Sequence, residues 1–164
     1  MSRYRPPRSV GTPLITPAGA QRLRAELDHL WRQKRPAVTQ AVSEAAALGD
    51  RSENAEYIYG KKMLREIDSR VRFLRKRLEA LKVVDQPPSD PTKVYFSAYV
   101  ELADEDDNAL RLRIVGPDEI DPKQQHISID SPIARALLGK TLDDEICVQA
   151  PGGERLYWIT AIAY

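Results

Sequence analysis

A heptad pattern in the second quarter of the chain restricts the possible folds more than any other feature. Its apolar residues are spaced alternately three and four apart: Leu64, Ile67, Val71, Leu74, Leu78 and Leu81. This spacing places one apolar stripe along a helix and is typical of a coiled coil. A looser pattern precedes it, in Leu23, Leu27, Leu30, Val38, Ala41, Ala45 and Leu48. Together the two patterns predict an antiparallel helical hairpin whose arms, of about 30 residues each, are roughly 45 Å long.

The beginning of the first arm and one break within it can also be predicted. Thr16 can cap the first helix, with Pro17 at its first helical position. Pro36 lacks a backbone N–H, so we expect a kink or local break near residues 32–35. A two-helix rod is too thin to enclose a pocket. Any chemistry of the hairpin must therefore lie on its surface or at its tip.

The second half of the chain has a different periodicity. Pro87, Pro88 and Pro91 mark a linker that no helix can continue through. Beyond it, five segments alternate with period two, and one short helix begins at Ser131 and Pro132 and ends at Gly139. The sequence therefore predicts an α+β protein with four parts: a basic, disordered arm (1–13), a coiled-coil hairpin (14–84), a linker (85–93) and a sheet-plus-helix domain (94–164).

Within the sheet, the acidic turn "ADEDDN" would join the first two strands, "VYFSAYVEL" and "ALRLRIVG". "HISID" would follow, and "PGGE" would join the last two strands, "EICVQA" and "LYWITAIAY". Cys147 stands alone in "EICVQA", which excludes an internal disulfide and predicts a buried thiol on a strand. His29 and His126 have no metal-ligand spacing, so we interpret both as surface or packing residues.

Charge divides the chain in the same place. The net charge is only +1, yet residues 1–84 contain 18 Lys and Arg against 9 Asp and Glu, and residues 85–164 contain 7 against 15. A basic half suggests a polyanion or an acidic protein surface as its partner. The sequence contains neither an apolar run long enough to span a membrane nor a secretory signal, so we expect a cytoplasmic protein without a membrane partner.

The turn between the two arms, "ALGDRSENAEY", is unusually acidic. Asp50, Glu53 and Glu56 recur every third residue. Gly49 can end the first helix, and Asp50 or Ser52 can cap the second in a capping-box pattern. A cap needs one acceptor, however, and this turn supplies three carboxylates. Oxygen ligands of this kind suit Mg²⁺, although two acids at an exposed tip become a good site only where a partner supplies the other ligands.

The helix behind the tip is strongly basic. Between residues 61 and 82 it carries nine cations against Glu66, Asp68 and Glu79. Such a face can be an ordinary solvated exterior of a coiled coil. The excess of one sign favours a polyanion instead, and Lys61, Lys62 and Arg65 are placed to hold a phosphate backbone while the tip addresses one bond in it.

With these features in place, the sequence resembles the Gre-type bacterial transcript cleavage factors, and their GreB branch in particular. The resemblance runs from about Thr12 to Tyr164. It rests on "PLITPAG", "LWRQKRPAVT", "AAALGDRSENAEYIYGKKMLREIDSRVRFLRKRLE", "RIVGPDEI" and "ISIDSPIARALLGK". The stretch that covers the tip and the second helix is highly specific, whereas the short strand motifs alone would not be.

The resemblance implies a coiled coil that enters the secondary channel of RNA polymerase and an FKBP-like domain that docks at the channel mouth. Such a protein is not itself an enzyme: it stimulates the polymerase's own Mg²⁺-dependent hydrolysis of the 3′ end of backtracked RNA, which rescues arrested transcription elongation. By match to the family's tip, Asp50 and Glu53 would help to hold the second Mg²⁺ and orient the attacking water. Arg51, Ser52, Asn54 and Tyr57 would shape the tip, and Asp130, Ser131 and Pro132 would contact the polymerase.

Two other functions remain open at this point. A related channel-binding regulator could occupy the same pore without chemistry, but it would have no need of Asp50 and Glu53 at a metal-binding spacing. A prolyl isomerase would need an apolar, aromatic-lined pocket, and the C-terminal half has few aromatic residues. We expect a monomer that binds no metal tightly by itself, with DNA-bound polymerase as its setting. The arm "MSRYRPPRSVG" precedes the expected start of the family and has no assigned role.

Overall fold

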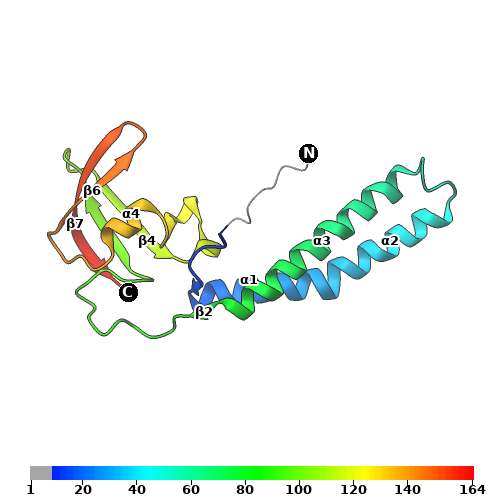
Figure 1. Cartoon of the computed structure of the whole chain (residues 1–164), viewed down its shortest axis with the longest axis horizontal. Coiled ribbons are helices and arrows are strands. Elements are labelled where there is room, and N and C mark those ends of the chain that lie inside the picture. Colours follow the sequence, from blue (N-terminus) through cyan, green and yellow to red (C-terminus); the bar gives the residue numbers. More distant parts are fainter. Residues whose placement is uncertain (1–8) are drawn as a thin grey trace. The chain divides into compact units, whose positions relative to one another are not determined.

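The computed structural model describes residues 9–164, so most of the predicted disordered arm lies outside the described residues. The described chain forms two compact units. One is the helical hairpin, residues 20–81, and the other combines the segment that ends at Gly19 with residues 82–164. Figure 1 shows the hairpin helices and the curled sheet of the second unit. No helix among the described residues is long and apolar enough to cross a membrane.

The hairpin confirms the predicted pairing of two long arms. The first arm comprises α1 (Pro17–His29), a π-helical turn (Leu30–Lys34) and α2 (Arg35–Ala47), and the second is α3 (Ala55–Ala80). Ile67, Val71 and Leu74 are buried along the predicted heptad seam of α3. On the first arm the seam passes through Val42, which is half-buried, rather than through the predicted residues Ala41 and Leu48, which are exposed.

The predicted break near Pro36 takes the form of the π-helical turn. The N–H of Arg35 donates to the carbonyl of Leu30, five residues back, and regular α-helix resumes with Pro36 in its first turn. Proline cannot donate, so a wider turn before it relieves the missing bond. The turn leaves Trp31 exposed, with the guanidinium groups of Arg75 and Arg35 lying 4.4 and 5.3 Å from its ring centre.

Paired side chains and one glycine fix how the arms of the hairpin meet. Arg70 binds Glu26 through two hydrogen bonds of 2.6 and 3.0 Å, and Arg35 binds Asp68 through two of 2.7 and 3.3 Å. Near the tip, Gly60 is buried, and a Cβ atom there would lie 2.5 Å from the Cγ2 atom of Val42. A glycine at this position therefore permits α2 and α3 to approach closely just below the tip.

The second unit is a five-stranded mixed sheet with one short helix, which confirms the predicted α+β class. The strand order is β5-β4-β3-β7-β6. The elements are β3 (Tyr99–Ala103), β4 (Ala109–Val115), β5 (His126–Ser128), α4 (Pro132–Leu137), β6 (Glu145–Ala150) and β7 (Gly153–Ala163). Ala134 and Leu137 of α4 are fully buried in one core with residues of β3, β4, β6 and β7. The hairpins predicted at "ADEDDN" and "PGGE" are both present.

Two details of this unit differ from the sequence prediction. The first strand begins at Tyr99 rather than Val94, because residues 94–98 turn sharply, with φ of +74° at Ser97. Cys147 is exposed, so the prediction of a buried thiol was wrong. On β6, Ile146 is buried and Cys147 points to the opposite face, as strand alternation requires. The pKa of the Cys147 thiol is raised, mainly because desolvation disfavours the thiolate.

The N-terminal segment also lies in the second unit, whereas the sequence predicted that the hairpin begins at residue 14. Leu14–Ile15 form β1, which pairs in parallel with β2, Lys82–Val83. Thr12, predicted to belong to the disordered arm, donates its backbone N–H to a carboxylate oxygen of Asp130 at 2.9 Å. Residues on both sides of the hairpin are thus part of the sheet unit, and the units separate at residues 19/20 and 81/82 rather than at the proline linker.

Candidate functional site at the hairpin tip

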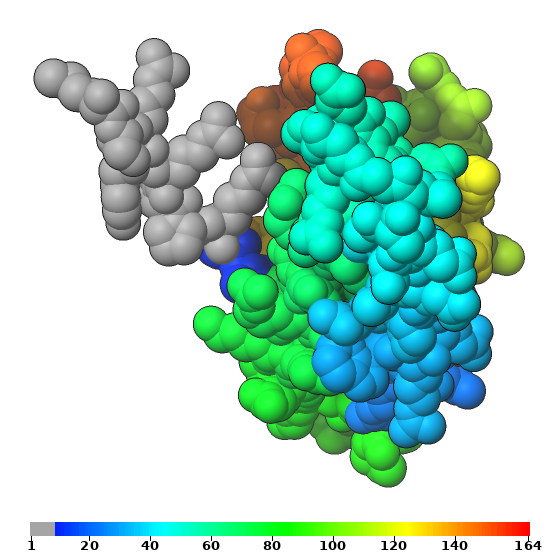
Figure 2. Space-filling view, turned by 90° about the vertical axis from the view of Figure 1, so that its right-hand side faces the viewer, coloured from blue at the N-terminus to red at the C-terminus, as the bar shows by residue number. Residues whose placement is uncertain are grey.

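The tip turn, residues 48–54, connects the two arms of the hairpin. The N–H of Leu48 donates to the carbonyl of Ala45, which ends α2, and Gly49 follows with φ of +137°. This backbone conformation is open to glycine and strained for other residues, so the predicted role of Gly49 is confirmed. Figure 2 looks toward the tip, whose residues (cyan) stand in front and are uncovered in this view.

Asn54, rather than Asp50 or Ser52, caps α3. Its Oδ1 atom accepts a hydrogen bond from the N–H of Tyr57 at 3.1 Å, and its Nδ2 atom donates to the carbonyl of Ala45 at 2.7 Å. One side chain therefore caps the second arm and also binds the end of the first. The predicted capping roles of Asp50 and Ser52 were wrong, because an asparagine at this position satisfies both helix ends and a carboxylate cannot donate to the carbonyl.

Asp50 is instead held by the residue two positions ahead. One oxygen, Oδ1, accepts hydrogen bonds from the backbone N–H and the hydroxyl of Ser52, at 2.9 and 2.8 Å. Both bonds lower the pKa of Asp50 below its ordinary value of 3.8, and the bond from the backbone N–H has the larger effect. The Oδ2 atom accepts no hydrogen bond from any side chain or backbone group of residues 9–164. The tip thus presents an ionised carboxylate with one oxygen held and the other open to solvent.

The other two acids of the tip are equally exposed. Glu53 precedes the cap, and Glu56 lies in the first turn of α3, where a negative charge is favourable. Among the described residues, no group of three or more His, Cys, Asp and Glu side chains is placed to hold a metal ion. The donor set nevertheless fits one end of a Mg²⁺ shell, because Mg²⁺ takes one or two protein carboxylates and completes its shell from elsewhere.

The remaining predicted tip residue, Tyr57, packs against the turn. The guanidinium of Arg51 lies over its ring, 5.8 Å from the centre. Around them, Leu48, Ile58 and Tyr59 have exposed fractions of 79%, 52% and 64%. Leu48 was predicted to lie on the apolar stripe of the first arm and is exposed instead, whereas Ile58 and Tyr59, near the start of α3, were not singled out from the sequence.

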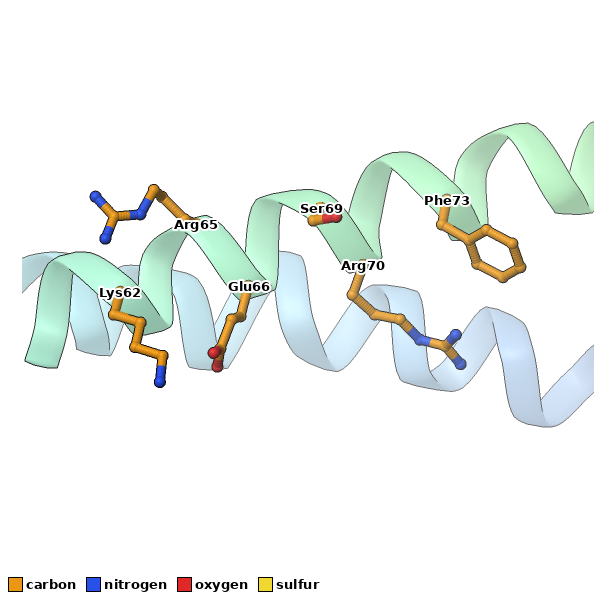
Figure 3. Close-up of a pocket in the computed structure, with 6 residues that line it drawn as sticks. All are labelled: Lys62, Arg65, Glu66, Ser69, Arg70 and Phe73. Carbon is orange, nitrogen blue, oxygen red and sulfur yellow. The ribbon is translucent and has the colours of Figure 1, made fainter. Parts of the chain in front are cut away.

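The predicted RNA-binding residues lie behind the tip on α3. Lys61, Lys62 and Arg65 are all exposed. An open groove of about 540 Å³ is lined by Lys62, Arg65, Glu66, Ser69, Arg70 and Phe73. Figure 3 shows Lys62 and Arg65 projecting to different sides of the helix. Arg70 is bound to Glu26, and within residues 9–164 no acidic side chain forms an ion pair with Lys62 or Arg65.

The residues predicted to dock on a polymerase lie together at the start of α4. Ser131 caps the helix through a hydrogen bond of 3.3 Å from the N–H of Ala134, and Pro132 takes the first helical position, as predicted. The carboxylate of Asp130 accepts from the backbone N–H and the hydroxyl of Thr12. Pro132 is exposed, whereas Asp130 already has a partner within the chain. The structure therefore gives Asp130 a structural role that the sequence did not reveal.

Comparison with known proteins identifies the family. The N-terminal model of the GreA/GreB transcription elongation factors matches residues 13–83, and the GreA/GreB C-terminal model matches residues 88–164. The chain is 71% identical over 164 residues to transcription elongation factor GreB of Pseudomonas aeruginosa, covering all of this chain and 98% of that protein. It is 63% identical over 150 residues to GreB of Yersinia pestis, covering 92% and 88%.

Among solved structures, a GreA/GreB factor from Nitrosomonas europaea is similar, with 24% identity and a TM-score of 0.43 over 93% of this chain and all of that one. The assignment rests on the sequence matches, which cover both units at identities far above 30%. The chain belongs to the GreA/GreB family of transcription elongation factors.

Proposed function

We propose that this elongation factor stimulates RNA polymerase to hydrolyse the 3′ end of backtracked RNA, and that Asp50 and Glu53 act directly in that reaction. One observation carries the proposal: the tip holds Asp50 ionised, with its Oδ1 atom fixed by Ser52 and its Oδ2 atom open. A carboxylate needed only for capping would be turned toward backbone N–H groups of α3. Here Asn54 caps the helix, which leaves the acids available to an outside ligand.

The tip residues have separable tasks in this proposal. Ser52 restricts the rotation of Asp50, so that the open oxygen meets its ligand without a large loss of side-chain entropy. Glu53 supplies a second carboxylate from the same turn. Together Asp50 and Glu53 would help to hold the second of two Mg²⁺ ions in the polymerase; such a pair would supply activation of water at one ion and stabilisation of the leaving oxygen at the other. Asn54 keeps both helix ends joined and thereby restrains the backbone of the turn that carries the two acids.

The other predicted sites complete the proposal. An elongation factor acts on RNA polymerase, and we place this one in the cytoplasm as a monomer that enters the secondary channel. Lys62 and Arg65 line the groove behind the tip and would contact phosphates of the extruded RNA, with Lys61 on the adjoining exposed surface. Ser131 and Pro132 would touch the rim of the polymerase. The hydrolysis itself belongs to the polymerase, so the factor is not an enzyme alone.

The test uses a halted, backtracked elongation complex with labelled RNA and Mg²⁺. The wild-type chain should release a short 3′ fragment faster than polymerase alone does. The double variant Asp50→Asn/Glu53→Gln keeps the size of both side chains but removes their charge. We expect its stimulation to fall by two or more orders of magnitude, because a catalytic ion contributes several kcal/mol and each 1.36 kcal/mol is about tenfold in rate.

A matched control replaces the third tip acid, Glu56→Gln, which lies on α3 beyond the cap. This control should retain most of the stimulation. The double variant should still compete with the wild-type chain for the polymerase, which separates binding from chemistry. An inactive wild-type chain that nevertheless binds would instead support a channel-binding regulator without cleavage activity. Full activity in the double variant would refute the role of the acids.

A further inference from the structure

A buried carboxylate far along the sequence from the tip has no part in the function above. Glu119 is only 4% exposed and lies in the short turn after β4. Its Oε2 atom accepts from the backbone N–H groups of Thr16 at 3.0 Å and of Gly116 at 3.1 Å, and its Oε1 atom accepts from the hydroxyl of Thr16. Both of its oxygens are therefore occupied by groups from two separate segments of the sheet unit.

The charge of Glu119 is compensated without a cation. Within residues 9–164, no lysine, arginine or histidine forms an ion pair with it. The carboxylate instead lies against the start of α1, where the free N–H groups of a helix favour a negative charge. Thr16 links the two: its hydroxyl donates to Glu119 and accepts from the N–H of Gly19 at 3.1 Å, which is the cap of α1. Glu119 thus extends the cap of the helix that leads into the hairpin.

Two glycines leave the space in which Glu119 and the segment before α1 pack closely together. A Cβ atom at Gly19 would overlap the carboxyl group of Glu119, and one at Gly116 would overlap the carbonyl oxygen of Leu14. Neither glycine has a φ in the left-handed region, so close approach rather than conformation calls for a residue without a Cβ atom. We call Thr16, Gly19, Gly116 and Glu119 the root clamp.

The chain leaving the hairpin is held in the same unit. The N–H of Lys82 donates to the carbonyl of Pro13 at 2.8 Å, and the N–H of Val84 donates to that of Ile15 at 2.9 Å. Segment 13–16 therefore has two sets of contacts. Its carbonyl groups accept from residues 82 and 84, which follow the hairpin, and Thr16 donates to Glu119. Thr16 thus joins α1 to Glu119: it caps the first turn of α1 through Gly19 and donates to the buried carboxylate of Glu119.

We propose that Glu119 is a positioning residue for the tip: it fixes the first turn of α1 on the sheet unit and thereby limits the orientations that the hairpin can adopt when that unit is bound to polymerase. The inference rests on the proposed function. Without the clamp, a bound factor would present its tip to the active site for a smaller fraction of the time. The loss would therefore appear in the maximal rate of cleavage rather than in the concentration needed to reach it.

The first test measures stimulated cleavage against factor concentration for the full chain. Glu119→Gln keeps the size of the side chain and one acceptor oxygen. Gly19→Ala keeps Glu119 but crowds its carboxyl group, although alanine is the better helix former. We expect both variants to lower the maximal rate about fivefold or more and to change the half-saturating concentration less than twofold. The double variant should lose little more than either single variant, because both disturb one contact.

The matched control is Glu145→Gln, the same chemical change at an exposed position of β6, which should leave both parameters unchanged. Circular dichroism and thermal unfolding establish that each variant is folded at the assay temperature. A merely structural role would alter stability and leave the maximal rate of the folded protein intact, and that outcome would overturn the proposal. An increase confined to the half-saturating concentration would overturn it as well.

The second test does not depend on cleavage. Cys147 is the only cysteine of the chain and is exposed on β6, so it accepts one spin label, and Ser43→Cys on the exposed face of α2 accepts the second. Pulsed electron–electron double resonance then gives the distribution of distances between the two labels, one on each unit. We expect a broader distribution in Glu119→Gln than in the parent and in Glu145→Gln. Equal widths would refute the positioning role, whereas a wild-type chain inactive in cleavage would refute the proposed function alone.

Discussion

The tip and the root clamp both depend on carboxylates, yet the two regions treat them in opposite ways. Asp50 at the tip is exposed, with one oxygen held by Ser52 and the other open. Glu119 in the root clamp is buried, and both of its oxygens accept hydrogen bonds from groups of the same unit. The first carboxylate retains binding capacity for an outside ligand, and the second uses all of its capacity inside the fold.

This difference teaches how to separate an acid that is open to an outside ligand from one that acts inside the fold. A buried carboxylate survives only when its hydrogen-bonding capacity is satisfied, so its removal leaves unsatisfied donors and costs stability. An exposed carboxylate with a fixed rotamer and an open oxygen contributes little to folding. In the proposed function such an oxygen serves a ligand outside the chain. The number and type of acidic residues do not distinguish these two kinds of carboxylate. The number of carboxylate oxygens that accept hydrogen bonds within the chain does.

The strongest test of this comparison removes one carboxylate from each region, Glu119 from the root clamp and Glu53 from the tip. Glu119→Ala leaves the N–H groups of Thr16 and Gly116 and the Thr16 hydroxyl without their acceptor, so we expect the free energy of unfolding to fall by about 3 kcal/mol. Glu53→Ala should leave the urea midpoint unchanged and strongly reduce stimulated cleavage. Urea titration followed by circular dichroism measures the first effect. Equal stability losses in the two variants would remove the distinction between the regions.

A smaller effect is expected at Asn54, which combines structure and function. Asn54→Ala removes the cap of α3 and the bond to Ala45, and we expect a loss of about 1 kcal/mol in hairpin stability. Asn54→Asp keeps the acceptor for Tyr57 but loses the donor to Ala45, so it should recover the cap and not the link between the arms. Hydrogen exchange at Leu48 and Tyr57 reports the two ends separately. Identical amide exchange rates in the two variants would show that the bonds of Asn54 to Tyr57 and to Ala45 cannot be lost separately.

The smallest effect concerns the ionisation of Asp50. Because Ser52 donates two hydrogen bonds that lower the pKa of Asp50, the stabilisation they give is present above the pKa of the unfolded chain, and it is lost as the pH falls through the lower folded pKa. Ser52→Ala removes the hydroxyl bond and should raise the pKa of Asp50 toward its ordinary value of 3.8. Carbon-detected NMR titration measures the shift. Cleavage near neutral pH should change little, since Asp50 is ionised in both forms; an unshifted pKa would mean that the backbone bond alone holds it.

The periodicity of the sequence was sufficient to predict much of the fold. The heptad of α3, the break before Pro36, the cap at Ser131 and both sheet hairpins follow from local spacing, and the structure confirms them. The position of the tip acids also follows from the turn between two periodic segments. These features depend on residues close together in the chain, which is where pattern arguments are strongest.

What the sequence could not supply are contacts between distant residues. Glu119 and Thr16 are 103 residues apart, and Asp130 and Thr12 are 118 apart, so no local pattern marks either pair. The strands β1 and β2 contain two residues each, too few to show any alternation. Cys147 was placed on the wrong face because a six-residue strand with apolar residues on both sides has no clear inner face. The site roles of Asp50, Glu53, Lys62 and Arg65 stay predictions until they are tested.

The π-helical turn of the first arm has a further consequence for how such a hairpin can vary in length. From Leu30 to Val38 the seam advances by eight residues, one more than a heptad, whereas Val38 to Ala45 restores a step of seven. A plain α-helix would rotate the following side chains by about 100° after such an insertion. The wide turn absorbs the extra residue, so the apolar stripe stays in phase on both sides of it. Deletion of one residue between Leu30 and Val38 would restore a step of seven, so we expect a plain α-helix there to keep the stripe in phase, whereas a second insertion would rotate it by about 100°.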